Sequence, residues 1–139
     1  MDFEYAPAPE SRSIVSIKPK YGHFIDGKFV NGRNHFATIN PATEEVLSQI
    51  ALGNASDVDK AVIAAQKAYT KTWSKLSGKE RGKYLYRIAR ILQERAREFA
   101  VLETLDNGKP IRETRDIDIP LVAAHFFYHA GWADKLDYA

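Results

Sequence analysis

The chain has 139 residues, of which 45% are hydrophobic and 27% are charged, a composition typical of one globular domain. The 20 basic and 18 acidic residues leave a net charge of +2, and because both signs occur along the chain we expect no nucleic-acid partner. The absence of cysteine excludes disulfides, thiolate metal sites and a cysteine nucleophile within these residues. Without a long apolar run or a basic leader segment, we expect a soluble cytoplasmic protein and no membrane partner.

The first part of the chain is predicted to be a flexible tail followed by strands. Prolines and serines interrupt any regular period over residues 1–19, which predicts the tail. From residue 21, short apolar runs flank Asp26-Gly27, a dipeptide that suits a two-residue hairpin turn. A strand over 35–39 ends at Asn40-Pro41, and a further extended stretch covers 46–52. The sequence therefore predicts an antiparallel β-meander within residues 21–52.

Helical periodicity dominates the rest of the chain. Ser56 and Asp59 form the pattern of a capping box for a helix over 57–73, and Ser77 with Glu80 repeats it for a helix over 78–107. Gly108 suits the left-handed C-cap of the second helix. A third helical segment runs over 112–136, kinked or restarted at Pro120. The predicted fold class is α+β, an amino-terminal antiparallel β-meander followed by three helical segments.

The third helical segment carries aromatic residues on every side of its axis. Phe126, Phe127, Tyr128 and Trp132 fall on successive directions around the helix. A meander and two amphipathic helices offer too little surface to cover them all. We therefore expect self-association, or a partner surface that these residues do not supply.

No pattern from the residues alone amounts to an active site. Gly108-Lys109 lacks the glycine and the hydroxyl residue of a phosphate loop, and no glycine-rich dinucleotide motif follows a strand. His125 and His129 have the spacing of a metal pair but no third ligand, so packed aromatic residues are the simpler interpretation. Asp116 and Asp118 point to different sides of a helix, which argues against a carboxylate dyad.

Several stretches together resemble the amino-terminal portion of the aldehyde dehydrogenase superfamily. The most specific is the run Leu102 to Pro110, which contains Asp-Asn-Gly-Lys-Pro, and Phe127-Tyr128-His129 is a local departure from the family pattern. The other matching stretches are residues 24–30, 38–46, 57–62 with 64–65, Trp73 followed by 80–82, and 130–135. The resemblance implies that residues 20–139 are the incomplete amino-terminal portion of a cofactor-binding domain, within the α/β fold of a longer parent enzyme.

The resemblance also implies an activity that this chain cannot perform alone. Members of the family use NAD or NADP to oxidise an aldehyde to a carboxylic acid, through a cysteine thiolate and a glutamate-activated water. The nucleophile, the base and the nucleotide-binding turn lie downstream of the matched region, so no catalytic or cofactor-binding residue maps onto this sequence. We therefore expect the segment alone to be inert and to hold no cofactor, with the remainder of the enzyme chain as its partner. The alternative is a standalone non-catalytic interaction or scaffold module derived from this fold.

Two minor sites are carried over by the resemblance. In relatives a monovalent cation is held near the positions of Thr38, Ile39 and Asp106, and oxygen ligands suit such a hard cation. Asp106 could instead cap the helix end. Leu121 matches a position that lines the aldehyde access tunnel, with a plain core leucine as the alternative.

Overall fold

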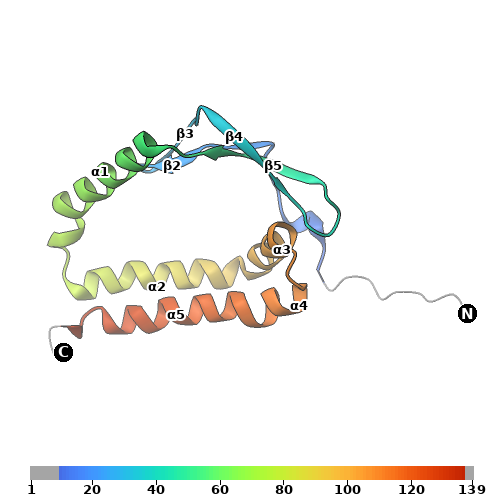
Figure 1. Cartoon of the computed structure of the whole chain (residues 1–139). Coiled ribbons are helices and arrows are strands. Elements are labelled where there is room, and N and C mark those ends of the chain that lie inside the picture. The colour runs from blue at the N-terminus through green and yellow to red at the C-terminus, as the bar shows by residue number, and fades with distance from the viewer. Residues whose placement is uncertain (1–9, 137–139) are drawn as a thin grey trace, which may run out of the picture.

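The protein is described from a computed structural model over residues 10–136, so residues 1–9 of the tail predicted for residues 1–19 lie outside the described residues. The strands are β1 Lys20–Tyr21, β2 His23–Ile25, β3 Lys28–Val30, β4 Asn34–Ile39 and β5 Val46–Leu52. The helices are η1 Arg12–Ile14, α1 Ala55–Lys71, η2 Trp73–Lys75, α2 Gly78–Glu94, α3 Ala96–Asn107, α4 Ile111–Glu113, the π-helical turn η3 Thr114–Asp118, and α5 Ile119–Trp132. In Figure 1 the strands form one layer, α2 and α5 form a second, and α1 joins the two on one side.

The strands confirm an α+β architecture but do not form one continuous meander. β2 and β3 form a separate antiparallel hairpin around Asp26 and Gly27, both of which have positive φ. β4 and β5 pair in antiparallel fashion, whereas β1 pairs with β5 in parallel, with Lys20 opposite Gln49. β4 pairs with one edge of β5, and β1 pairs with the other edge, so backbone groups on both sides of β5 have partners. This long-range pairing differs from the predicted order of neighbours.

The helix termini show which local signals determine the fold. Ser77 and Glu80 form the predicted capping box of α2, and Gly108 takes the predicted left-handed conformation at φ 80°. The box predicted for Ser56 and Asp59 is wrong. Asn54 caps α1 instead, with Asp57 as its partner, because the helix begins two residues earlier.

The second predicted helix is two helices. Arg95 leaves the helical conformation at φ −106° and ψ 18°, so α2 ends at Glu94 and α3 begins at Ala96. Its guanidinium group bonds Glu98 at 2.5 Å and lies 5.4 Å from the ring centre of Phe99. The apolar spacing runs through this break unchanged, so the periodicity could not reveal it.

The third helical segment also contains an irregularity. The π-helical turn η3 directly precedes α5, and Pro120 is the second residue of α5. The residues before it, Asp118 and Ile119, are already helical, so the helix continues from η3 into α5. Thr114 is fully buried there, and its hydroxyl lies 3.1 Å from the carbonyl oxygen of Ala100. α5 ends at Trp132, earlier than the predicted residue 136.

The buried core lies where α2, α3 and α5 meet, and it is small. Its apolar members on these helices are Ala89, Ala100, Val101, Leu105, Ile119 and Ala123. α2 and α5 approach closely because Gly82 has no side chain, and a Cβ there would lie 2.9 Å from the carbonyl oxygen of Ala130. By contrast α1 buries none of its residues, and Val62 and Ile63 are 61% and 67% exposed. Much apolar surface is therefore uncovered. No helix within residues 10–136 is long and apolar enough to cross a membrane.

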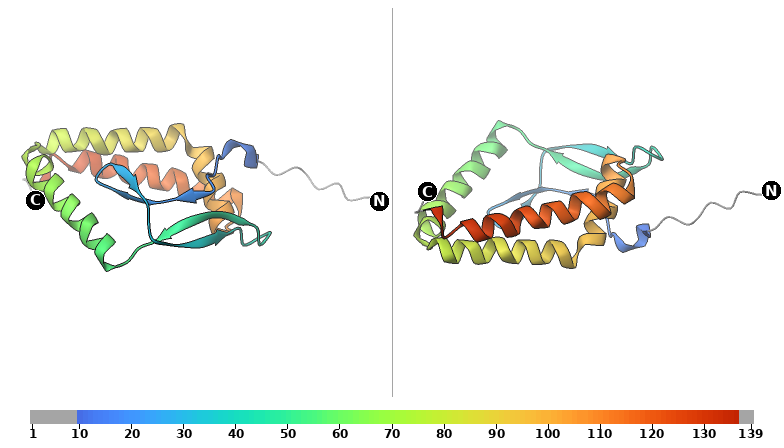
Figure 2. Two further views of the ribbon diagram at one scale, coloured as in Figure 1. Left: turned by 90° about the horizontal axis from the view of Figure 1, so that it is seen from above. Right: turned by 90° about the horizontal axis from the view of Figure 1, so that it is seen from below.

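Residues 10–19 contact the helices and strands despite their irregular sequence. The carboxylate of Glu10 is 7% exposed and lies 2.7 Å from Arg97 on α3. The carbonyl oxygen of Lys18 accepts a hydrogen bond of 2.8 Å from the Ser48 hydroxyl on β5. Figure 2 shows this segment from two sides, running from α3 towards the strands.

Candidate functional site

The junction between β4 and α3 brings together two residues that sequence reasoning selected. The hydroxyl of Thr38 donates a hydrogen bond to a carboxylate oxygen of Asp106, which is 68 positions away in the chain. Both residues line a cavity of about 270 Å³. The other lining residues are Ile17, Tyr21, Leu47, Ser48, Ile50 and Leu102. Polar oxygens therefore meet an apolar recess at this junction.

Ile39 has a different position from its neighbour. The β4–β5 register shifts between Thr38 and Ile39, and such a bulge redirects the backbone of a strand. The Ile39 side chain is 46% exposed and does not line the cavity. Any part that Ile39 has in a site thus involves its backbone.

The Asn40-Pro41 turn fixes the end of α3 against β4. Asn40 is buried, and its side-chain oxygen accepts a hydrogen bond of 3.0 Å from the backbone N–H of Ala42. A Cβ on Gly108 would lie 3.1 Å from the Cβ of Pro41. The N–H of Gly108 donates a hydrogen bond to the carbonyl oxygen of Thr104 and so caps the end of α3. The Asp106 carboxylate accepts the hydrogen bond from Thr38.

The chemistry available at this junction is that of oxygen ligands. Carboxylate and carbonyl oxygens suit hard cations. Within residues 10–136 no group of three or more histidine, cysteine, aspartate or glutamate side chains could hold a metal ion. A cation here would therefore depend on backbone carbonyl oxygens together with the carboxylate of Asp106.

The candidate residues of α5 do not form a site by themselves. Leu121 is 51% exposed, and His125 and His129 are also exposed. Tyr128 and Trp132 are 60% and 44% exposed, with ring centres 6.1 Å apart.

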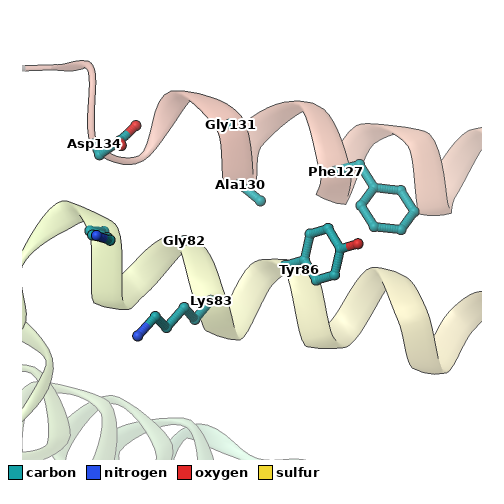
Figure 3. Close-up of a pocket in the computed structure, with 8 residues that line it drawn as sticks. Gly82, Lys83, Tyr86, Phe127, Ala130, Gly131 and Asp134 are labelled. Atoms are coloured by element: carbon teal, nitrogen blue, oxygen red, sulfur yellow. The ribbon is translucent and has the colours of Figure 1, made fainter.

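On another side of α5, the half-buried Phe127 packs edge-on against Tyr86, with 5.0 Å between the ring centres. These two rings lie in a hollow between α2 and α5 (Figure 3). The aromatic residues predicted on every side of this helix are thus covered on one side only.

The two aspartates near η3 serve in separate ion pairs. Arg115 bonds Asp116 at 2.6 Å and holds the pKa of that carboxyl below its usual range. Lys109 lies 2.5 Å from Asp118, and this hydrogen bond raises the pKa of Lys109. The two carboxylates therefore pair with different cations.

Sequence reasoning missed a histidine cluster where the hairpin meets α1. The Nε2 atom of His23 lies 3.6 Å from Asp57, and neither it nor the Nε2 atom of His35 has a hydrogen-bond partner. Burial, then Lys20 and His23, lower the pKa of His35. Isolated histidines at positions 23 and 35 carry no spacing signal, so only the folded chain identifies this cluster.

Comparison with known proteins gives this geometry its family context. The model of the aldehyde dehydrogenase family matches residues 29–139. The chain belongs to the aldehyde dehydrogenase family. It is 47% identical to DhaS of Bacillus subtilis over 116 residues, which are 81% of this chain and 23% of DhaS. It is 42% identical to the mitochondrial aldehyde dehydrogenase of Rattus norvegicus over 138 residues, 93% of this chain and 25% of that protein.

Solved aldehyde dehydrogenases share the same fold. The NAD⁺ complex of the aldehyde dehydrogenase from Bacillus cereus superimposes with a TM-score of 0.81 at 38% identity, covering 84% of this chain and 24% of that one. PnpE in complex with nicotinamide adenine dinucleotide gives a TM-score of 0.80 at 39% identity, with the same coverage. The chain spans about a quarter of the length of these relatives.

Proposed function

We propose that this chain is the amino-terminal portion of a longer NAD(P)-dependent aldehyde dehydrogenase, which oxidises an aldehyde to a carboxylic acid. The observation that carries the proposal is the family match over residues 29–139, since the chain corresponds to about a quarter of each relative. Two structural relatives are complexes with a nicotinamide cofactor, which supports the cofactor class.

We further propose that these residues alone are inert. The chain contains no cysteine to attack an aldehyde. No glycine-rich dinucleotide motif follows a strand in this sequence, so no residue of this chain is assigned to the cofactor. The contribution of this portion is to supply helices and strands against which the rest of the enzyme packs.

Two measurements test the proposal. The native gene and the intact mass of the native protein should show a polypeptide several times longer than 139 residues, containing a cysteine downstream. That polypeptide should reduce NAD⁺ or NADP⁺ in the presence of an aldehyde, whereas purified residues 1–139 should not. Steady cofactor reduction by the short chain, above a contaminant control, would contradict the assignment of the chemistry to downstream residues.

The Thr38–Asp106 junction is proposed to hold a monovalent cation, with backbone oxygens of Thr38 and Ile39 and the carboxylate of Asp106 as ligands. The contact of Thr38 with Asp106 and the bulge beside Ile39 support it. A ligand that binds only the folded state raises the unfolding temperature. At constant ionic strength, we expect potassium or sodium chloride to stabilise the protein relative to choline chloride. Asp106→Asn should remove this difference, and Glu103→Gln on the same helix should retain it.

The uncovered face of α5 is proposed to contact the remainder of the enzyme. Leu121, Tyr128 and Trp132 are all exposed by 44% or more. We propose that Leu121 lines the aldehyde access tunnel, because it matches such a position in the family, and its location on this exposed face near the start of α5 supports the proposal. If Leu121 contacts substrate, Leu121→Ala in the full enzyme should change the ratio of the KM for a bulky aldehyde to the KM for a short one. An equal change for all aldehydes would contradict that role.

The same exposed face favours a second candidate function, a non-catalytic module that assembles through this surface. In isolation, residues 1–139 should self-associate at micromolar concentration, because burying one aromatic side chain contributes on the order of 2 to 3 kcal/mol. Light scattering measures this. A native protein that ends near residue 139 and assembles with partners would favour the module over the enzyme.

A further inference from the structure

The charges of the chain are segregated, despite its small net charge. The segment from Lys60 to Arg90, both included, contains nine basic side chains and one acidic side chain, Glu80, which gives it a net charge of +8. Since the whole chain carries +2, the other residues together carry −6. The expectation of no nucleic-acid partner was based on mixed charges, and that description does not hold for residues 60–90.

This basic segment covers α1 beyond Lys60, η2 and most of α2, which meet at one corner of the molecule (Figure 1). Six of its cations follow one another every four residues: Lys67, Lys71, Lys75, Lys79, Lys83 and Arg87. All six are exposed, and none has an acidic partner within 4.0 Å among residues 10–136. On α2, the four-residue spacing places Lys79, Lys83 and Arg87 on one face of the helix.

Aromatic rings lie among these cations. The ring centres of Trp73 and Tyr84 are 5.7 Å apart, and the two residues are 37% and 48% exposed. Tyr84, Lys83 and Arg87 share the lining of a hollow of about 210 Å³ with Leu76 and Glu80. The corner thus offers positive charge and flat aromatic surface side by side.

We propose that the corner formed by residues 60–90 binds a single-stranded nucleic acid. Helices α1 and α2 have 17 residues each and so extend about 25 Å each, which distributes the charge over a length that suits a polyanion better than a small anion. Phosphates pair with the cations, and bases stack on exposed aromatic rings. An acidic protein surface would match the charge but would leave Trp73 and Tyr84 without a planar partner. The inference is independent of the proposed dehydrogenase function.

The test uses the full native polypeptide and a fluorescently labelled 12-residue oligothymidylate, with binding followed by anisotropy at several salt concentrations. Contact with about four phosphates predicts a slope of about −3 for log affinity against log salt. The double variant Lys83→Gln/Arg87→Gln should reduce the magnitude of that slope by about 1.4 and weaken binding at 50 mM salt by more than about tenfold. The matched control Lys20→Gln/Lys28→Gln removes the same charge from the strands and should bind as the parent does.

A second variant separates nucleic acid from acidic protein as the partner. Trp73→Leu should weaken oligothymidylate binding about tenfold and leave the binding of polyglutamate unchanged. Circular dichroism checks that each variant is folded. The proposal is overturned if the full polypeptide does not bind the oligonucleotide, if the strand control loses as much affinity as the corner variant, or if Trp73→Leu has no effect while polyglutamate competes equally.

Discussion

Thr38 on β4 and Asp106 on α3 are joined by a hydrogen bond from the Thr38 hydroxyl to the Asp106 carboxylate. The contact connects the strand layer to the end of the helix that precedes Gly108. Two sequence stretches typical of the family meet at this contact. The contribution of the Thr38–Asp106 hydrogen bond to the free energy of unfolding can be measured by substitution.

Thr38→Val is expected to lower the free energy of unfolding by about 1 kcal/mol, because the hydrogen bond from the half-buried Thr38 to the exposed carboxylate of Asp106 is lost. In a double-mutant cycle of Thr38→Val with Asp106→Ala, the coupling energy between the two residues should also be about 1 kcal/mol. Urea unfolding provides the four values. Strictly additive effects of the two substitutions would mean that the bond does not stabilise the fold.

Ser77→Ala is expected to destabilise the protein by about 1 kcal/mol at pH 7, since it removes the side-chain cap of α2. Hydrogen bonds from the Ser77 backbone and side chain lower the pKa of Glu80 from its ordinary value of 4.5. The stability from this box is present above that value and is lost as the pH falls through the lower folded pKa. The effect of Ser77→Ala should therefore shrink as the pH is lowered below 4.5. Ser56→Ala is the control, and it should change stability by less than about 0.5 kcal/mol.

His35 is expected to make the fold sensitive to mild acid. Burial is the main cause that lowers its pKa from 6.5, so the unfolded chain takes up a proton more readily than the folded one. Stability from this group is therefore intact above pH 6.5 and declines as the pH falls below it. His35→Gln should reduce the difference between denaturant midpoints at pH 7.5 and pH 5.5, and the exposed His129→Gln should not. An unchanged difference in His35→Gln would assign the acid sensitivity to other groups.

Two glycines of the α2–α5 pair are expected to respond in opposite ways to alanine. Gly82→Ala places a Cβ 2.9 Å from the Ala130 carbonyl oxygen, which forces the helices apart and should cost about 1 to 3 kcal/mol. Gly131→Ala meets no atom within 4 Å, so the gain in helix propensity should stabilise the chain by up to about 1 kcal/mol. Thermal unfolding of the two variants compares them. If the rest of a longer enzyme packs on Gly131, Gly131→Ala should destabilise the full polypeptide instead. Measuring this variant in both the isolated chain and the full polypeptide tests that possibility.

The sequence by itself determined the features that depend on near neighbours. The Ser77–Glu80 box, the left-handed Gly108 and the turn at Asp26-Gly27 each follow from residues within one turn or one loop. The resemblance of several ordered stretches also indicates the family and points to Thr38 and Asp106 as site residues. These signals are local or are carried by motifs, so a linear reading contains them.

Only the tertiary structure decided which distant segments meet. The parallel pairing of β1 with β5 joins residues about 30 positions apart, and no local pattern distinguishes it from a meander. The break at Arg95 lies inside an unbroken apolar stripe, and the capping of α1 moved to Asn54 because the helix begins earlier than its stripe suggests. The strand pairing depends on contacts between residues far apart in the chain, which periodicity and capping patterns do not encode.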